Sequence, residues 1–249
     1  RRKEPDMKRL ALVAATLLLA ACGQQGATTP SPTTAQQEPA IVFAAASLNT
    51  VFPAIADATY SFDGSSGLVD QLKGGALADV FASADKKNMD KAVDADLIDG
   101  DPVMSATNYL VLVTPADNPA GITGFDASLD GTKLVVCAAD VPCGAATLKA
   151  AEANGLTLTP VSEEAKVTDV LGKVTAGEAD AGLVYATDAA GAGDKVTVFD
   201  VPGAKDDPNT YWIGIVKGAP NKARADAFIA TVTGEGQAKL AAAGFGPPR

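Results

Sequence analysis

The side chains available for chemistry in this chain are limited first by the complete absence of histidine. Ser-His-Asp hydrolysis, Cys-His chemistry and zinc sites built on imidazole are therefore excluded. Catalysis would have to use Ser, Lys, Asp, Glu or Tyr. Ser83 and Lys86 have the Ser-x-x-Lys spacing of one class of acyl-transferring enzymes, but the companion Ser-Asp-Asn and Lys-Thr-Gly elements are missing. An acyl-transfer enzyme is therefore a remote alternative, and we do not expect an enzyme.

Cys22 ends a segment with the order of a bacterial export signal. Two basic residues precede an apolar run over 10–18, which is too short to span a bilayer, and Leu-Ala-Ala-Cys follows at 19–22. This sequence resembles the lipobox of bacterial lipoproteins, which implies removal of the signal (1–21) and lipidation of Cys22 at the outer face of the cell membrane. The alternative is an ordinary secretory signal with an incidental Cys22. Residues 22–39, rich in Gln, Thr, Pro, Ser and Ala, favour the lipoprotein because they are typical of a disordered tether.

Cys137 and Cys143 remain after Cys22 is assigned to the anchor. They are close in sequence and on the oxidising side of the membrane, so we expect a disulfide between them. Free buried thiols are the alternative. A metal site would need further Cys or His ligands, and the chain has no histidine.

The composition restricts the partners of the exported chain. Residues 1–6 precede Met7 and resemble no export element, so they are left out of the fold together with the signal. Removing residues 1–21 takes away five basic and two acidic residues, which leaves 15 basic and 28 acidic residues and a net charge of about −13. Such a chain repels nucleic acid. It also repels anions at long range, so an anion site must work through short-range hydrogen bonds.

The body of the chain alternates short apolar runs with helical patterns, which predicts an α/β fold with largely parallel sheets. No repeat of 20 to 50 residues is present. The expected strands cover residues 41–43, 80–81, 109–113, 134–136, 182–185, 196–199 and 213–216. The expected helices begin at about residue 48 and cover 88–95, 145–153, 167–176 and 222–232.

Small and polar residues gather where the expected strands end and helices begin. Ligands of α/β sheets bind at these places, where free N–H groups of helices point outward. Ser47 ends the first such turn, Ala-Ala-Ala-Ser-Leu at 44–48, and could simply cap the next helix. Comparable turns are Phe-Asp-Gly-Ser-Ser-Gly at 62–67, Ala-Asp-Val-Phe-Ala-Ser-Ala-Asp-Lys at 78–86, Asp-Val-Pro-Cys-Gly at 140–144, Lys-Val at 166–167 and Gly-Leu-Val-Tyr-Ala-Thr-Asp-Ala at 182–189.

Over residues 40–245 these turns, in this order, resemble the molybdate-binding receptors of ABC importers. The resemblance implies the two-lobed α/β fold of type II periplasmic binding proteins, with a ligand cleft between lobes that close by a hinge motion. We expect one lobe at 40–107 and 210–249, and the other at 108–209. The resemblance further implies a monomeric lipoprotein without a cofactor, which delivers molybdate, and also tungstate, to the membrane permease subunits of an ABC importer.

Five residues become the expected ligands when the family's contacts are transferred to the matching turns. Ser47 and Ser65 would donate from hydroxyl and backbone N–H groups, Tyr185 from its phenol, and Cys143 and Val167 from backbone N–H groups. Molybdenum would thus be bound as the molybdate oxyanion, through its oxygens. Cys143 stands where the family usually has alanine, which leaves the backbone N–H unchanged. The simpler alternatives are a strand-end aromatic for Tyr185 and a core side chain for Val167.

A site made of donors alone suits a fully deprotonated anion. Hydrogen bonds to a charged acceptor contribute roughly 1.5 to 3 kcal/mol each, so several of them can offset the desolvation of a dianion. Molybdate, tungstate and sulfate carry no proton at neutral pH, whereas hydrogen phosphate carries one that needs an acceptor. The resemblance implies that sulfate is excluded by size. A receptor for sulfate, phosphate or another tetrahedral oxyanion is the alternative.

Overall fold

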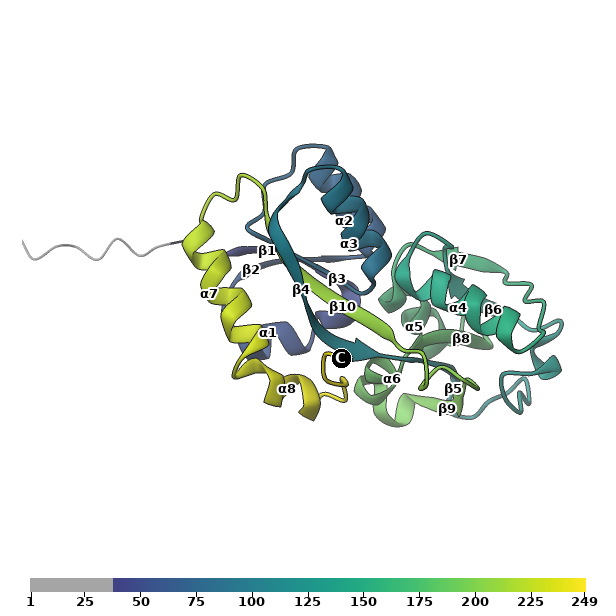
Figure 1. Ribbon diagram of the computed structural model, residues 1–249. Helices are drawn as coiled ribbons and strands as arrows, with labels where there is room; N and C mark the ends of the chain where they lie inside the picture. The colour runs from purple at the N-terminus through teal and green to yellow at the C-terminus, as the bar shows by residue number, and fades with distance from the viewer. Residues whose placement is uncertain (1–37) are drawn as a thin grey trace, which may run out of the picture. The chain divides into compact units, whose positions relative to one another are not determined.

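Two five-stranded sheets, each with helices on its faces, form two lobes, and this confirms the predicted fold class (Figure 1). The structure is a computed structural model that describes residues 38–249. The predicted signal, Cys22 and nearly all of the predicted tether lie outside the described residues. Among the described residues, no helix combines the length and the apolar character needed to cross a membrane.

The first lobe takes its elements from both ends of the described chain. They are β1 (Ile41–Ala45), η1 (Ala46–Leu48), α1 (Val51–Ile55), β2 (Thr59–Asp63), α2 (Ser65–Lys73), β3 (Val80–Ser83), α3 (Lys86–Asp94), β4 (Ile98–Asn108), β10 (Asn209–Val216), α7 (Lys222–Thr233) and α8 (Gly236–Ala242). The strand order is β2-β1-β3-β10-β4. Helices α2 and α3 lie on one side of this sheet, and α1, α7 and α8 lie on the other (Figure 1).

The second lobe is one continuous stretch of chain. Its elements are β5 (Leu110–Pro115), η2 (Ala127–Leu129), β6 (Leu134–Cys137), α4 (Pro142–Ala153), β7 (Ser162–Glu164), α5 (Val167–Thr175), β8 (Ala181–Tyr185), α6 (Ala186–Ala192), η3 (Gly193–Lys195) and β9 (Val196–Asp200). The strand order is β7-β6-β8-β5-β9.

Both sheets are mixed, and not largely parallel as the sequence predicted. Strands joined through helices stay parallel: β1 pairs with β2 and β3, and β6 pairs with β7 and β8. The strand that enters each sheet directly from the other lobe runs the other way. β4 continues into β5 across Tyr109 alone, and β5 enters its sheet antiparallel to β8, while β10 returns antiparallel to β3. The direct crossing, without a helix, is the reason for the reversed direction.

Alternating side chains in β5 divide the core of the second lobe between two helices. Successive residues of a strand point to opposite faces of the sheet. Leu112 belongs to the buried cluster that contains Ala151 of α4, whereas Val111 and Val113 belong to the cluster that contains Val170 of α5. Both helices begin just after the carboxyl ends of parallel strands, β6 and β7, so their first turns reach the same edge of the sheet.

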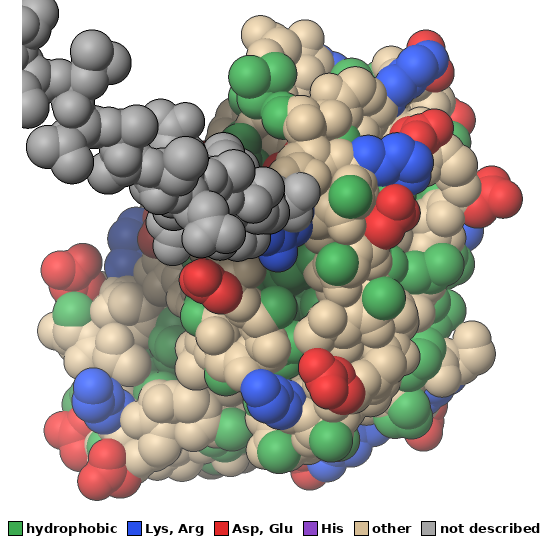
Figure 2. Space-filling model, turned by 90° about the vertical axis from the view of Figure 1, so that its left-hand side faces the viewer, with side chains coloured by type: hydrophobic (Ala, Val, Ile, Leu, Met, Phe, Trp, Pro, Cys, Tyr) green, Lys and Arg blue, Asp and Glu red, His purple; other side chains and the backbone are tan. Residues whose placement is uncertain are grey.

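Charged side chains are spread out on the face drawn in Figure 2. Acidic and basic side chains alternate there among apolar and neutral polar ones, outside the area covered by the grey atoms. The excess of acidic residues in the chain is therefore not gathered into one patch on this face.

Candidate functional site

All five expected ligand residues line one small cavity. Ser47 and Ser65 come from the first lobe, and Cys143, Val167 and Tyr185 come from the second. The remaining lining residues are Ala45, Ala46, Asp63, Gly64, Ala84, Val141 and Pro142. The cavity volume is about 10 Å³, roughly the space needed by one water molecule, so the two lobes lie close together around it. The structure therefore brings the five residues together, and their role as ligands remains a prediction.

Three helices begin at this cavity without a capping side chain. The N-caps of α2, α4 and α5 are Gly64, Val141 and Lys166, and none of them caps through its side chain. By contrast, Asp85 caps α3 and Asn221 caps α7 through side-chain oxygens. The first N–H groups of a helix have no acceptor within the helix. The first turns of α2, α4 and α5 therefore present donors and the positive ends of three helix dipoles to the cavity, an arrangement that suits an anion.

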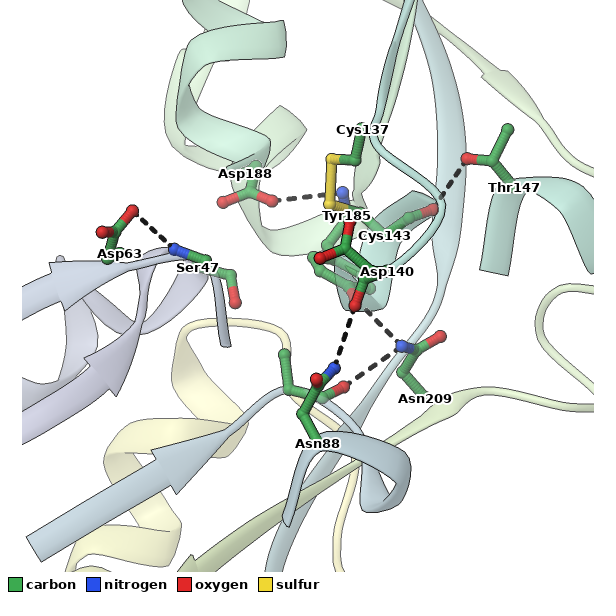
Figure 3. The surroundings of a disulfide bond; sticks show 12 residues. Ser47, Asp63, Asn88, Cys137, Asp140, Cys143, Thr147, Tyr185, Asp188 and Asn209 are labelled. Carbon is green, nitrogen blue, oxygen red and sulfur yellow. Dashed lines mark hydrogen bonds between the residues drawn. A yellow bond between two sulfur atoms is a disulfide. The ribbon is translucent and has the colours of Figure 1, made fainter. Parts of the chain in front are cut away.

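Two hydroxyl groups at the cavity already accept a hydrogen bond from the protein. The backbone N–H of Ala84 donates to Ser65 Oγ over 3.0 Å. Asn209 Nδ2 donates to Tyr185 Oη over 2.9 Å (Figure 3). Ser47 Oγ lies 2.8 Å from Tyr211 Oη, and either oxygen can be the donor. Ser65 and Tyr185 therefore each keep one proton that they can donate into the cavity.

The cavity lining contains no basic side chain, and its one acidic side chain is Asp63. Both oxygens of this carboxylate are engaged. Asp63 Oδ1 accepts from the Gly64 N–H over 2.8 Å, and Oδ2 accepts from Gln71 Nε2 over 3.0 Å. The lining therefore offers a bound anion neutral donors and helix N-termini.

Burial keeps the phenol at the cavity in its donor form. It raises the pKa of Tyr185 well above the usual value of 10.0, and it raises the pKa of Tyr211 as well. Both side chains are almost completely inaccessible, and their rings meet edge to face. Tyr185 therefore stays protonated at neutral pH.

Asp188 is the titratable group that packs directly behind Tyr185. Its Oδ2 accepts from the Tyr185 N–H over 3.1 Å, at the start of α6. Burial raises its pKa to about 7. The folded state therefore binds a proton that the unfolded chain, with a pKa of 3.8, releases between about pH 4 and pH 7.

Replacing Asp188 by asparagine should stabilise the protein at high pH. The native contribution of Asp188 is most favourable at low pH and is lost as pH rises through about 7, whereas asparagine does not titrate and can still accept from the Tyr185 N–H. Thermal unfolding from pH 5 to pH 8 should show a Tm advantage of the variant that grows with pH. Asp180→Asn is the control, because Asp180 also accepts a backbone N–H, that of Lys133, but in an exposed place. A Tm difference that stays constant with pH would contradict the prediction.

The predicted disulfide is present in the structure. Cys137 at the end of β6 is bonded to Cys143 in the first turn of α4, with an S–S distance of 1.99 Å (Figure 3). The next residue, Gly144, packs so tightly that a Cβ atom there would lie 1.9 Å from the carbonyl oxygen of Ala138. The disulfide and this glycine together hold the turn that presents the Cys143 N–H.

Several residues that shape the cavity are not marked by the sequence. Asn209 donates to Tyr185 from a distant strand, Gly64 packs against Ala165 of the other lobe, and Asn88 Nδ2 donates to the Asp140 carbonyl over 3.3 Å. Such contacts across the two lobes depend on the tertiary structure, and no local pattern predicts them. Of Asn209, Gly64 and Asn88, Gly64 alone lies inside one of the turns that the sequence predicted as ligand-binding.

Comparison with known proteins gives consistent matches over the described part. The family described as bacterial extracellular solute-binding protein matches residues 27–246. The molybdate-binding protein ModA of Mycobacterium tuberculosis (strain H37Rv) is 43% identical over 252 residues, which cover 95% of this chain and 97% of that protein.

Two solved structures show how widely this fold is shared. The periplasmic molybdate-binding protein of Azotobacter vinelandii superposes with a TM-score of 0.74 at 22% identity, over 84% of this chain and 100% of that chain. The sulfate-binding protein SubI of Mycobacterium tuberculosis H37Rv superposes with a TM-score of 0.65 at 19% identity, over 84% and 87%. The fold is thus common to proteins named for different oxyanions, and the identity of the ligand must be decided at the site.

Proposed function

This chain belongs to the bacterial extracellular solute-binding proteins, and from that premise we propose that it captures molybdate outside the cell membrane for an ABC importer. As a member of this family it is a binding protein and not an enzyme. The observation that carries the proposal is the convergence of hydroxyl donors and three uncapped helix N-termini on one small cavity without a basic side chain.

Molybdate fits the chemistry of this lining. It is a dianion without a proton at neutral pH, so it needs only donors, and each hydrogen bond to a charged acceptor contributes roughly 1.5 to 3 kcal/mol. Hydrogen phosphate would need an acceptor for its proton. Asp63 is the one carboxylate at the cavity, and both its oxygens already accept hydrogen bonds. Sulfate has the same donor requirement as molybdate, so size must separate these two anions.

The proposed ligand set consists of the five residues that the sequence predicted. Ser47, Ser65 and Tyr185 donate from their hydroxyl groups, and Cys143 and Val167 donate from backbone N–H groups in the first turns of α4 and α5. Tungstate has the same charge and shape as molybdate, so this set would bind it as well. Because the five residues come from both lobes, binding would hold the lobes together.

The cellular setting extends this proposal beyond the described residues. The export signal before Cys22 supports lipid anchorage at the outer face of the cell membrane, with residues 22–39 as the tether. We place the lobe boundaries at 40–107 with 210–249, and at 108–209, and the protein acts as a monomer. Permease subunits would distinguish the loaded receptor from the empty one because only the closed form aligns surfaces of both lobes.

Calorimetric titration of residues 38–249, which form one compact unit, tests the function. Molybdate and tungstate should bind tightly, and sulfate and hydrogen phosphate should not. Ser47→Ala and Tyr185→Phe should each weaken molybdate binding about tenfold, the effect of losing one hydrogen bond to a charged acceptor.

Tyr60→Phe is the matched control for the loss of a phenol. Tyr60 Oη donates to the Phe52 and Ala56 carbonyls, away from the cavity, so this variant should bind molybdate like the wild type. Selective binding of sulfate or hydrogen phosphate would support an oxyanion receptor but contradict molybdate as its ligand.

A further inference from the structure

Asn209 is the first residue of β10, at the point where the chain returns from the second lobe to the first. Its Nδ2 donates to the Ala84 carbonyl over 3.1 Å and to Tyr185 Oη over 2.9 Å (Figure 3). The backbone N–H of Ala84 in turn donates to Ser65 Oγ over 3.0 Å. The Asn209 carboxamide and the backbone of Ala84 therefore connect two hydroxyl groups of the cavity, Tyr185 and Ser65, that belong to different lobes.

The directions of these hydrogen bonds follow from the groups themselves. A peptide carbonyl can only accept, so Asn209 must turn its N–H₂ group, and not its oxygen, toward Ala84. The same nitrogen then faces Tyr185 Oη, which must accept. The phenolic proton cannot point at Asn209 and is left for an acceptor in the cavity.

Ser65 is oriented in the same way, because the Ala84 N–H can only donate to its Oγ. The direction of the hydrogen bond at Ser47, by contrast, is not fixed. Its partner is Tyr211 Oη, another hydroxyl group, and either oxygen can supply the proton. Of these three hydroxyl groups, Tyr185 and Ser65 are thus fixed as donors, and Ser47 is not.

We propose that Asn209 is a positioning residue that determines specificity: it commits the Tyr185 hydroxyl to donating, and so favours oxyanions without a proton. The proposal rests on the proposed function. A protonated oxyanion such as hydrogen phosphate would need an acceptor at this position, and Asn209 denies it the phenolic oxygen. Asn209 does not line the cavity, so it acts through Tyr185 and not by touching the anion.

A double-mutant cycle tests whether Asn209 acts through this hydroxyl. Asn209→Ala should weaken molybdate binding about tenfold, because the phenolic proton is no longer directed into the cavity. Tyr185→Phe should weaken binding by a similar factor. In the Tyr185→Phe background the further change Asn209→Ala should have almost no effect, since no hydroxyl remains to be oriented.

A second measurement is the ratio of the Kd values for hydrogen phosphate and molybdate. This ratio is internal to each sample and does not depend on how much of a variant is folded. It should fall in Asn209→Ala and stay at the wild-type value in Asn154→Ala. Asn154 is the matched control, because its Nδ2 also donates to two backbone carbonyls, those of Ala150 and Pro202, and none of these residues lines the cavity.

The outcomes separate the two proposals. Failure of the wild type to bind molybdate overturns both the proposed function and the role of Asn209. Tight molybdate binding by the wild type, together with additive effects of Asn209→Ala and Tyr185→Phe or an unchanged ratio, overturns the role of Asn209 alone.

Discussion

Gly64→Ala is expected to weaken molybdate binding about 100-fold while each lobe stays folded. Gly64 has φ −61° and ψ 140°, a conformation that any residue adopts, so alanine strains neither β2 nor α2. A Cβ atom there would lie 2.1 Å from the carbonyl oxygen of Ala165, in the other lobe. A backbone atom cannot move aside as a side chain can, so the lobes must separate. Overpacking costs of about 3 kcal/mol correspond to the expected 100-fold loss.

The measurement combines calorimetric titration with thermal unfolding and small-angle X-ray scattering. Gly67→Ala is the control on the same helix. Its Cβ atom would lie 3.5 Å from the Asp63 carboxylate, an ordinary contact, and alanine favours a helix over glycine by up to about 1 kcal/mol. This control should bind molybdate normally and be slightly more stable. If Gly64→Ala also bound normally, the Ala165 contact would not govern closure of the lobes.

The candidate site could be located from the sequence because its proposed donors lie where helices begin. A buried strand, a turn of small residues and a helix follow each other within a few positions, so apolar runs and turn residues reveal all three. Ser65 directly follows the N-cap of α2, and Cys143 and Val167 lie in the first turns of α4 and α5. Local sequence therefore places the donors, while the contacts that orient them come from distant parts of the chain. Asn209, for example, lies 125 residues from Ala84.

Strand β4 is an element that the hydrophobic and turn patterns of the sequence did not predict. Residues 98–108 include Gly100 and Pro102, both unfavourable in strands, and no strand is expected there from the sequence. The structure accommodates them because β4 is an edge strand of its sheet, and its pairing with β10 shifts register between Ile213 and Ile215. Edge strands and bulges tolerate a residue without an N–H. A strand that serves as a crossing between lobes is formed by its tertiary setting more than by its propensity.

Removing the disulfide is expected to have the largest effect on stability. Cys137 and Cys143 are six positions apart, and a bond that closes so short a loop stabilises the folded state by about 2 kcal/mol in the chain-entropy description. The double variant Cys137→Ala/Cys143→Ala should therefore lose about 2 kcal/mol in the free energy of unfolding, measured with denaturant. A thiol reductant should lower the stability of the wild type by a similar amount and leave that of the variant unchanged, which is the internal control.

Molybdate affinity should fall much less than stability in the same variant, by under tenfold. The turn that presents the Cys143 N–H has two other restraints. Pro142 fixes φ at the first position of α4, and Gly144 lets the first turn pack against the Ala138 carbonyl. The backbone donor should therefore keep its place once the protein is folded. A loss of affinity as large as that expected for Gly64→Ala would mean that the disulfide itself, and not the proline and glycine beside it, holds this donor in the cavity.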